Sequence, residues 1–264
     1  MAPGDMMLID HLKELRNRFL RVVVITIAIM IFCTVFGVQI VTFSGYTFYF
    51  IVPTVYNNIA SQVTLFLSEN LIPAGVNLIQ TAPGQSLYAQ LYVAVLISVS
   101  AAIPLIVREI VAFVSPALTT TSKNKTLISA ILPVFVLFVC GILFSFYLAI
   151  PITLTFLYQY GQALGVLTFL NISDFINFVL QFFIAFGISF QLPLIMFIIS
   201  FAGLVGLDFW LRNFKYALLI IIIFGAVITP DGSGITMWFI SGPMLLLYML
   251  GILSIKFKNR SDSN

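Results

Sequence analysis

The chain has 264 residues, of which 61% are hydrophobic and only 8% are charged, and its net charge is +3. Soluble domains carry roughly a quarter charged residues, so this composition excludes a soluble globule and indicates an integral membrane protein. A net charge this small and scattered gives no indication of a nucleic-acid partner. The chain has a single histidine, which argues against a histidine-based metal centre. Its two cysteines lie in apolar runs, which argues against a disulfide or a metal pair.

Six charge-poor stretches are candidates for membrane-spanning helices, since a helix needs about 20 apolar residues to cross the hydrocarbon. They are 20–38, 87–107, 126–150, 175–203, 216–229 and 235–255. The fifth is short, and PDGSG between it and the sixth is typical of a tight turn. We therefore predict an all-α polytopic membrane protein with six transmembrane helices in a single domain, 1–264, whose last two helices form a short hairpin.

The distribution of basic residues predicts the orientation. All 12 Lys and Arg residues lie before the first span, between the second and third, between the fourth and fifth, or after the sixth. The segments on the other side carry only acidic charges, which are Glu69, Asp174 and Asp231. The positive-inside rule then places both termini in the cytoplasm. A cleaved signal peptide would also explain a basic segment before an apolar run, but its removal would leave five spans and spoil the charge asymmetry.

The outer segment 39–86 is long for a loop and rich in aromatic and β-branched residues, with a single charge at Glu69. We favour a packed cap over the outer ends of the helices. The alternative is that VYNNIASQVTLFLSE, residues 55–69, forms an amphipathic helix lying on the outer surface.

Residues 8–21 predict a helix that runs into the first span, because apolar residues recur there at helical spacing. They are Leu8, Leu12, Leu15 and Phe19. The presence of Arg18 and Arg21 is explained by topology, since they hold the N-terminus inside, and by contact with anionic lipid. Glu14 contributes nothing to positive-inside retention, so it is a candidate binding group.

The span interiors contain glutamines, Gln181 and Gln191, but no Asp, Glu, Lys, Arg or His. Ionisable groups within spans mark proton relays and ion-coupled transport sites, and intramembrane proteases need them too. Their absence, with that of a GxSxG serine, predicts a protein that is neither an enzyme nor cofactor-dependent. Gln191 either hydrogen-bonds to a partner helix or is satisfied between the protein's own helices.

Five motifs occur in an order that fits the predicted topology. They are HLKELRNR (11–18), IVAFVSPAL (110–118), FYLAIPITLTFL (146–157), AFGISFQLPL (185–194) and TPDGSG (229–234). Through them, essentially the whole chain resembles the TatC family, the signal-peptide receptor subunit of the twin-arginine protein translocase.

The resemblance implies binding of twin-arginine signal peptides of folded precursor proteins at the cytoplasmic face. It also implies a higher-order complex with single-span TatA-type, and in some systems TatB-type, subunits, and transport driven by the proton-motive force. The expected location is the cell membrane, with thylakoid and mitochondrial inner membranes as alternatives. The positions carried over are Glu14, Arg16 and Arg18 before span one, Phe113 and Pro116 in the first cytoplasmic loop, Gln191 at a partner-helix contact and Asp231 in the last outer turn.

The chain departs from the family pattern at Ser122, where members commonly have a second glutamate in the first cytoplasmic loop. Two guanidinium groups need more than one acceptor, since one exposed ion pair contributes only about 0–1 kcal/mol. Our hypothesis is that Glu109 takes over, with the hydroxyls of Ser122 and Thr119–Thr121 as further acceptors. Gln191 and Gln85 are also neutral where members often have glutamate.

Two other functions remain as alternatives. A small-solute secondary transporter would usually show internal repeats and paired broken helices, and neither is evident in the sequence. A purely structural membrane scaffold is the weaker alternative.

Overall fold

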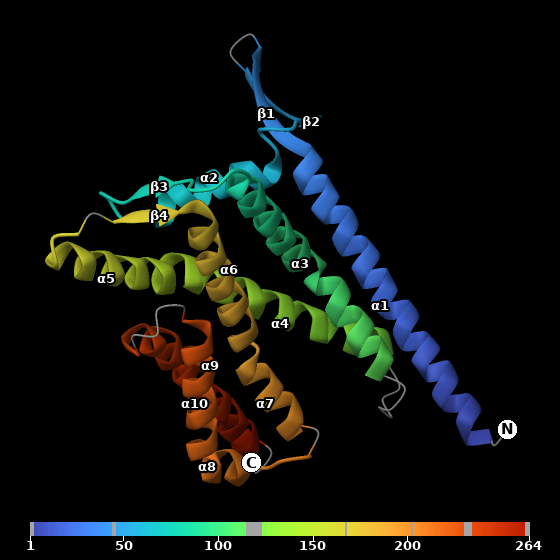
Figure 1. The fold of residues 1–264 in the computed structure, drawn as a ribbon. Helices are drawn as coiled ribbons and strands as arrows, with labels where there is room; N and C mark the ends of the chain where they lie inside the picture. The colour runs from blue at the N-terminus through green and yellow to red at the C-terminus, as the bar shows by residue number, and fades with distance from the viewer. Residues whose placement is uncertain are drawn as a thin grey trace. The chain divides into compact units, whose positions relative to one another are not determined.

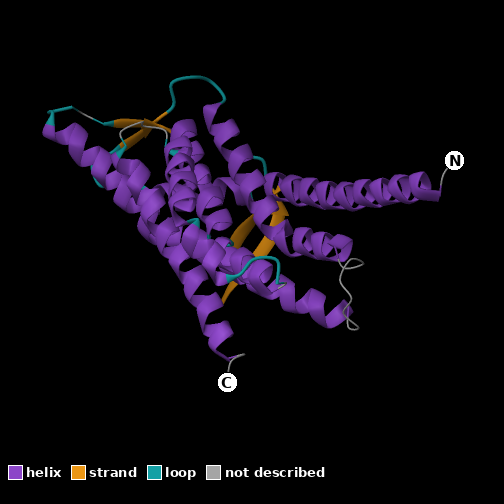
Figure 2. Cartoon of the chain, turned by 90° about the horizontal axis from the view of Figure 1, so that it is seen from below, coloured by secondary structure: helices purple, strands orange, loops and turns teal. Residues whose placement is uncertain are grey.

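The structure, a computed structural model, describes residues 3–43, 46–114, 123–166, 168–201, 203–229 and 234–261. The chain divides into two compact units, Met1–Glu69 with Ala82–Phe135 and Asn70–Thr81 with Val136–Asn264. Helices dominate both units, and the strands found among the described residues form two short pairs (Figure 2).

Two long helices, α1 (Pro3–Val35) and α3 (Gln85–Val114), lie side by side in the first unit (Figure 1). Both contain apolar segments long enough to cross a membrane, Leu12–Val35 and Gln85–Ile110. The predicted continuity of the N-terminal helix with span one is therefore confirmed. The predicted end of that span, residue 38, is three residues too late, because the chain becomes extended after Val35.

A β-hairpin that the sequence analysis did not predict follows α1 directly. Strands β1 (Phe36–Phe43) and β2 (Tyr46–Pro53) pair antiparallel, from Phe36 opposite Pro53 to Phe43 opposite Tyr46. Aromatic and β-branched residues favour strands, and the segment contains little else. Gly37 is required here, since a side chain at this position would collide with the backbone carbonyl of Asn57.

The helix considered within 55–69 is present as α2 (Ile59–Leu71). Asn58 caps it, because its Oδ1 accepts a hydrogen bond of 2.8 Å from the Ser61 backbone N–H. Ala60 is buried in a cluster with Cys33 of α1 and Ala94 of α3. This helix is therefore packed against both long helices of its unit.

The third apolar stretch is longer than predicted. Helix α4 (Lys123–Phe144) continues through the π-helix η2 (Ser145–Ala149) into α5 (Ile150–Ala163). Residues 151–163, which follow the predicted third span, are thus helical, and Pro151 is tolerated because it lies in the first turn of α5. Strands β3 (Asn77–Ile79) and β4 (Phe169–Asn171) pair in parallel in the second unit.

The fourth predicted span is broken into α6 (Ile172–Ser189) and α7 (Leu192–Phe201). Pro193, the second residue of α7, explains the interruption, because its nitrogen has no hydrogen to donate to the preceding turn of a continuous helix. Phe190 and Gln191 form the turn between the two helices. The predicted span over 175–203 corresponds to one apolar helical segment long enough to cross a membrane, Ile172–Ser200, and the turn within it was not predicted.

Helices α8 (Leu207–Arg212), α9 (Phe214–Ile228) and α10 (Ile235–Ser261) complete the second unit. The helices α9 and α10 pack together as the predicted hairpin, with Gly225 against Ser241. Five helical segments in the described residues are long and apolar enough to span a membrane, and α9 is a shorter apolar helix, as predicted.

Glycines allow close packing between α4 and α6. A Cβ on Gly141 would lie 2.5 Å from the carbonyl oxygen of Phe186, and one on Gly187 would collide with the ring of Phe138. The rings of Phe144 and Phe186 contact each other at a centroid distance of 5.2 Å beside this crossing. Small residues that let backbones approach are typical of helix interfaces in membranes.

Candidate functional site

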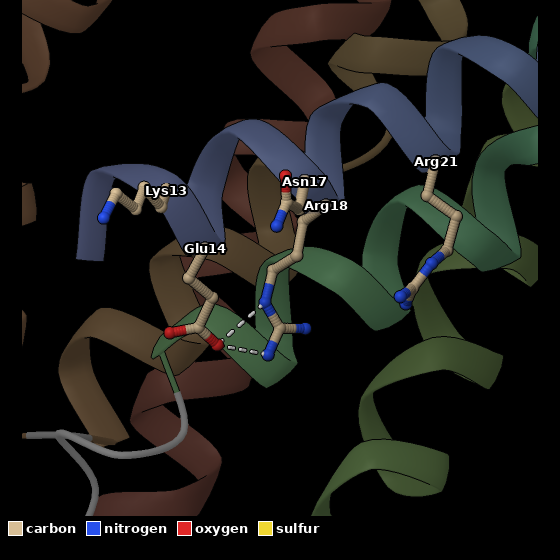
Figure 3. A pocket seen from close by; sticks show the side chains of 5 residues that line it. All are labelled: Lys13, Glu14, Asn17, Arg18 and Arg21. Carbon is tan, nitrogen blue, oxygen red and sulfur yellow. Dashed lines mark hydrogen bonds and ion pairs between the residues drawn. The ribbon is translucent and has the colours of Figure 1, made fainter. Parts of the chain in front are cut away.

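A pocket of about 420 Å³ lies against the N-terminal part of α1 (Figure 3). Five side chains of that helix line it: Lys13, Glu14, Asn17, Arg18 and Arg21. Residues three, four and seven positions apart share one face of a helix, and the spacing of these residues follows that rule. The sequence thus places polar side chains on one face of α1 just before the helix becomes apolar.

Glu14 and Arg18 point toward each other within this pocket (Figure 3). The guanidinium of Arg18 donates to a single carboxylate oxygen, Oε1 of Glu14, from Nε at 3.1 Å and from Nη2 at 2.6 Å. The side chain of Glu14 is 43% exposed and that of Arg18 is 23% exposed. The carboxylate is therefore accessible while it holds a guanidinium group.

A second carboxylate, Glu109 of α3, completes the arrangement. Its side chain is only 5% exposed, and each of its oxygens accepts a bond of 2.9 Å, Oε2 from Arg18 Nη1 and Oε1 from Arg21 Nη1. Arg108 lies further away, with Nη1 at 3.9 Å from Oε1. A buried carboxylate is tolerated only when it is paired and hydrogen-bonded, and the two arginines of α1 meet that requirement.

We refer to Glu14, Arg18, Arg21 and Glu109 as the Arg–Glu cluster. Its two acidic and two basic groups are balanced in charge, and three of the four come from α1. Arg18 is central, since its guanidinium contacts both carboxylates. The cluster joins the N-terminal part of α1 to the C-terminal part of α3 and presents one accessible carboxylate.

Of the residues predicted to form the site, Glu14, Arg18 and Glu109 are in direct contact. Arg16 is exposed on α1 and does not line the pocket. Pro116, Ser122 and Asp231 lie outside the described residues, and the side chain of Phe113 does too.

Gln191 occupies the turn between α6 and α7 in the second unit, where its Nε2 donates to the Gly187 carbonyl oxygen at 3.3 Å. Gly187 is four residues before Gln191, so this is a local bond at the end of α6, and both interpretations of Gln191 stay predictions.

Sequence reasoning missed the structural role of Arg21, which was interpreted as a topology signal. Its partner, Glu109, is 88 residues away, so no local pattern could have revealed the pair. Lys13 and Asn17 were missed as well, although their spacing from Glu14 and Arg18 places them on or beside the same helix face.

The chain is similar to known proteins over nearly its whole length. The family model of the Sec-independent protein translocase protein TatC matches residues 10–243. TatC of Cenarchaeum symbiosum is 48% identical over 99% of this chain and 98% of its own length. TatC of Carboxydothermus hydrogenoformans is 29% identical over 97% of this chain and 96% of its own length.

A crystal structure of the twin-arginine translocase receptor TatC superposes on this chain with a TM-score of 0.76. The two are 26% identical, and the match covers 94% of this chain and 98% of that one. These matches give no support to the alternative of a small-solute transporter. The chain is a multi-pass membrane protein, and it belongs to the TatC family of Sec-independent protein translocases.

Proposed function

We propose that this protein is the receptor component of a twin-arginine translocase and that the pocket on α1 binds the signal's arginines. The observation that carries the proposal is the accessible carboxylate of Glu14, which already holds a guanidinium group in a pocket of about 420 Å³. Planar guanidinium groups form the strongest charge-assisted bonds with carboxylates. Family membership supports the same function.

Within this proposal, Glu14 accepts a signal arginine directly, and Arg16 and Arg18 support the surface around it. Glu109 is the second carboxylate, in place of the glutamate that Ser122 replaces. Phe113 and Pro116 shape the first cytoplasmic loop. The structure describes the surroundings of only Glu14, Arg16, Arg18 and Glu109 among these residues.

The partners proposed for the complex are folded precursor proteins with twin-arginine signals and single-span TatA-type, and where present TatB-type, subunits. Gln191 contacts a partner helix, and Asp231 belongs to the last outer turn. The protein acts as a single membrane domain by binding and assembly, without catalysis or a cofactor. Transport is driven by the proton-motive force across the cell membrane.

The test is a binding measurement with the full chain in lipid nanodiscs and a fluorescent peptide carrying a twin-arginine signal. Glu14→Gln removes the charge but keeps the side-chain size, and we expect binding to weaken at least tenfold, since a charge-assisted bond to the peptide is lost. Replacing both peptide arginines with lysine provides the ligand control. Unchanged affinity in Glu14→Gln would refute the assignment of the pocket.

Glu109→Gln examines the second carboxylate in the same assay. We expect weaker binding, because Arg18 then has Glu14 as its remaining carboxylate in the cluster. If the affinity is unchanged, Glu109 does not belong to the binding site.

A further inference from the structure

The carboxylate that should receive an arginine from the signal peptide already holds one from the chain itself. Arg18 directs Nε and Nη2 at Oε1 of Glu14, which is the contact an incoming guanidinium would make. We propose that Arg18 is an internal placeholder, displaced from Glu14 when the signal binds, and that this exchange lowers the affinity of the pocket for any cationic guest. The inference rests on the proposed function of the pocket.

Arg18 can leave Glu14 without losing all of its ion pairs. Its third nitrogen, Nη1, donates to Oε2 of Glu109 at 2.9 Å, and this bond does not involve Glu14. When a signal arginine takes Glu14, Arg18 keeps its bond to Glu109. The exchange therefore replaces one guanidinium by another on Glu14 and leaves no buried charge unpaired, which would be costly.

Burial decides which of the two carboxylates exchanges its partner. Glu14 is 43% exposed and Glu109 only 5% exposed. Glu109 is also held through its other oxygen by Arg21 at 2.9 Å. An incoming side chain reaches Glu14 first, while Glu109 retains Arg18 in the cluster. Glu109 is thus the anchor of the placeholder, and Glu14 is the exchange position.

The exchange and the preference for arginine are separate quantities. Arg18 contacts Glu14 through two N–H donors in one plane, and another guanidinium reproduces this fork, whereas an ammonium group is a compact point charge without that geometry. The free energy needed to displace Arg18 is the same for an arginine and for a lysine guest. The exchange therefore lowers the affinity for both guests by one factor and leaves the ratio of their Kd values unchanged.

The remaining cations of the pocket reinforce the effect. Lys13 and Arg21 line the pocket with Arg18, so any cation entering it is repelled unless it pairs with a carboxylate. Glu14 is the accessible carboxylate among the five lining residues. Binding of a cationic peptide consequently requires displacement of Arg18 from Glu14.

The experiment compares Arg18→Gln with Arg21→Gln in nanodiscs of uncharged lipid, using twin-arginine and twin-lysine peptides. Both variants remove one positive charge from the same face of α1, but Arg18 is bonded to Glu14 whereas Arg21 is bonded to Glu109. We expect Arg18→Gln to bind the twin-arginine peptide about fivefold more tightly than wild type, the equivalent of one lost competing ion pair. The twin-lysine peptide should gain by the same factor, and Arg21→Gln, which leaves the bond between Arg18 and Glu14 in place, should tighten binding by less.

Two further variants secure the interpretation. Arg212→Gln removes a basic charge outside the cluster, and we expect wild-type binding of both peptides. Arg18→Lys keeps the charge but lacks the planar fork, so it should compete less strongly for Glu14, and the twin-arginine peptide should bind more tightly than to wild type. This variant decides the matter if Arg18→Gln does not fold: a wild-type Kd in Arg18→Lys overturns the proposal.

The outcomes separate the inference from the function on which it rests. If the wild type binds the twin-arginine peptide and loses it in Glu14→Gln, but folded Arg18→Gln binds no more tightly than Arg21→Gln, the placeholder role alone is refuted. If the wild type fails to bind, or binds independently of Glu14, both the function of the pocket and the placeholder role are refuted.

Discussion

The hydrogen bonds that Glu109 accepts from Arg18 and Arg21 contribute to the free energy that holds α1 against α3, and this contribution can be predicted. Glu109→Gln removes the charge of a side chain that is 5% exposed and that accepts bonds of 2.9 Å from Arg18 and Arg21. A hydrogen bond to a charged group contributes about 1.5–3 kcal/mol. The bond from Arg21 counts for less, because that side chain is 54% exposed.

Desolvation of the wild-type carboxylate offsets part of this gain, so we expect Glu109→Gln to lower the free energy of unfolding by about 2 kcal/mol. That value corresponds to roughly a thirtyfold change in the unfolding equilibrium constant. The assay is reversible unfolding of the purified chain in mixed micelles by a denaturing detergent. Glu69→Gln is the matched control, since Glu69 is exposed and surface substitutions usually change stability by less than about 0.5 kcal/mol.

A double-mutant cycle with Arg18→Gln and Glu109→Gln measures the contribution of this pair directly. Because the two side chains are in contact, we expect a coupling free energy of about 1–2 kcal/mol. Fully additive effects, or a Glu109→Gln variant as stable as wild type, would refute the reasoning. Either result would mean that the bonds to Glu109 contribute no net free energy to the packing of α1 against α3.

Three further predictions concern the rest of the fold. Gly141→Ala should destabilise the chain by about 2 kcal/mol in the same unfolding assay, because the new methyl group meets a backbone carbonyl. Its control, Gly242→Ala, places a methyl group in open space and should be neutral or stabilising. Equal effects of the two substitutions would contradict the close packing of α4 against α6. Tyr248→Phe should cost about 1 kcal/mol, since the hydroxyl donates to a backbone carbonyl oxygen at 2.9 Å; an unchanged unfolding midpoint would contradict this. In a cysteine-free background, a membrane-impermeant thiol reagent added to intact cells should label Glu69→Cys but not Lys256→Cys, and the reverse result would overturn the orientation.

Much of the fold could be predicted from the sequence, because a membrane fixes the length of apolar helices and the side on which basic residues lie. The charge-poor stretches located the spans, and the hairpin of α9 and α10 followed from the short fifth span and its turn. Glu14 and Arg18 are four residues apart on one helix, so their pairing could also be expected from the sequence.

The features that sequence reasoning missed depend on distant residues or on local geometry. The pairing of Arg21 with Glu109 joins positions 88 residues apart, and nothing near Arg21 distinguishes it from an ordinary topology signal. The β1–β2 hairpin was missed because an uncharged aromatic segment fits a packed loop as well as a strand pair. The break at Gln191 was missed because prolines are tolerated within spans, so Pro193 alone did not require one.

The Arg–Glu cluster also resolves a conflict between topology and binding. The chain has 12 basic and 9 acidic residues, and the positive-inside rule requires the basic ones at the inner ends of its helices. A receptor for arginines must therefore offer a carboxylate among arginines of its own, which will pair with it before any guest arrives. A partner with a second anchor, as Arg18 has in Glu109, makes that pairing reversible. Arg18 can then satisfy the topology rule, balance the charge of the Arg–Glu cluster when no guest is bound, and release Glu14 when an arginine of the signal binds.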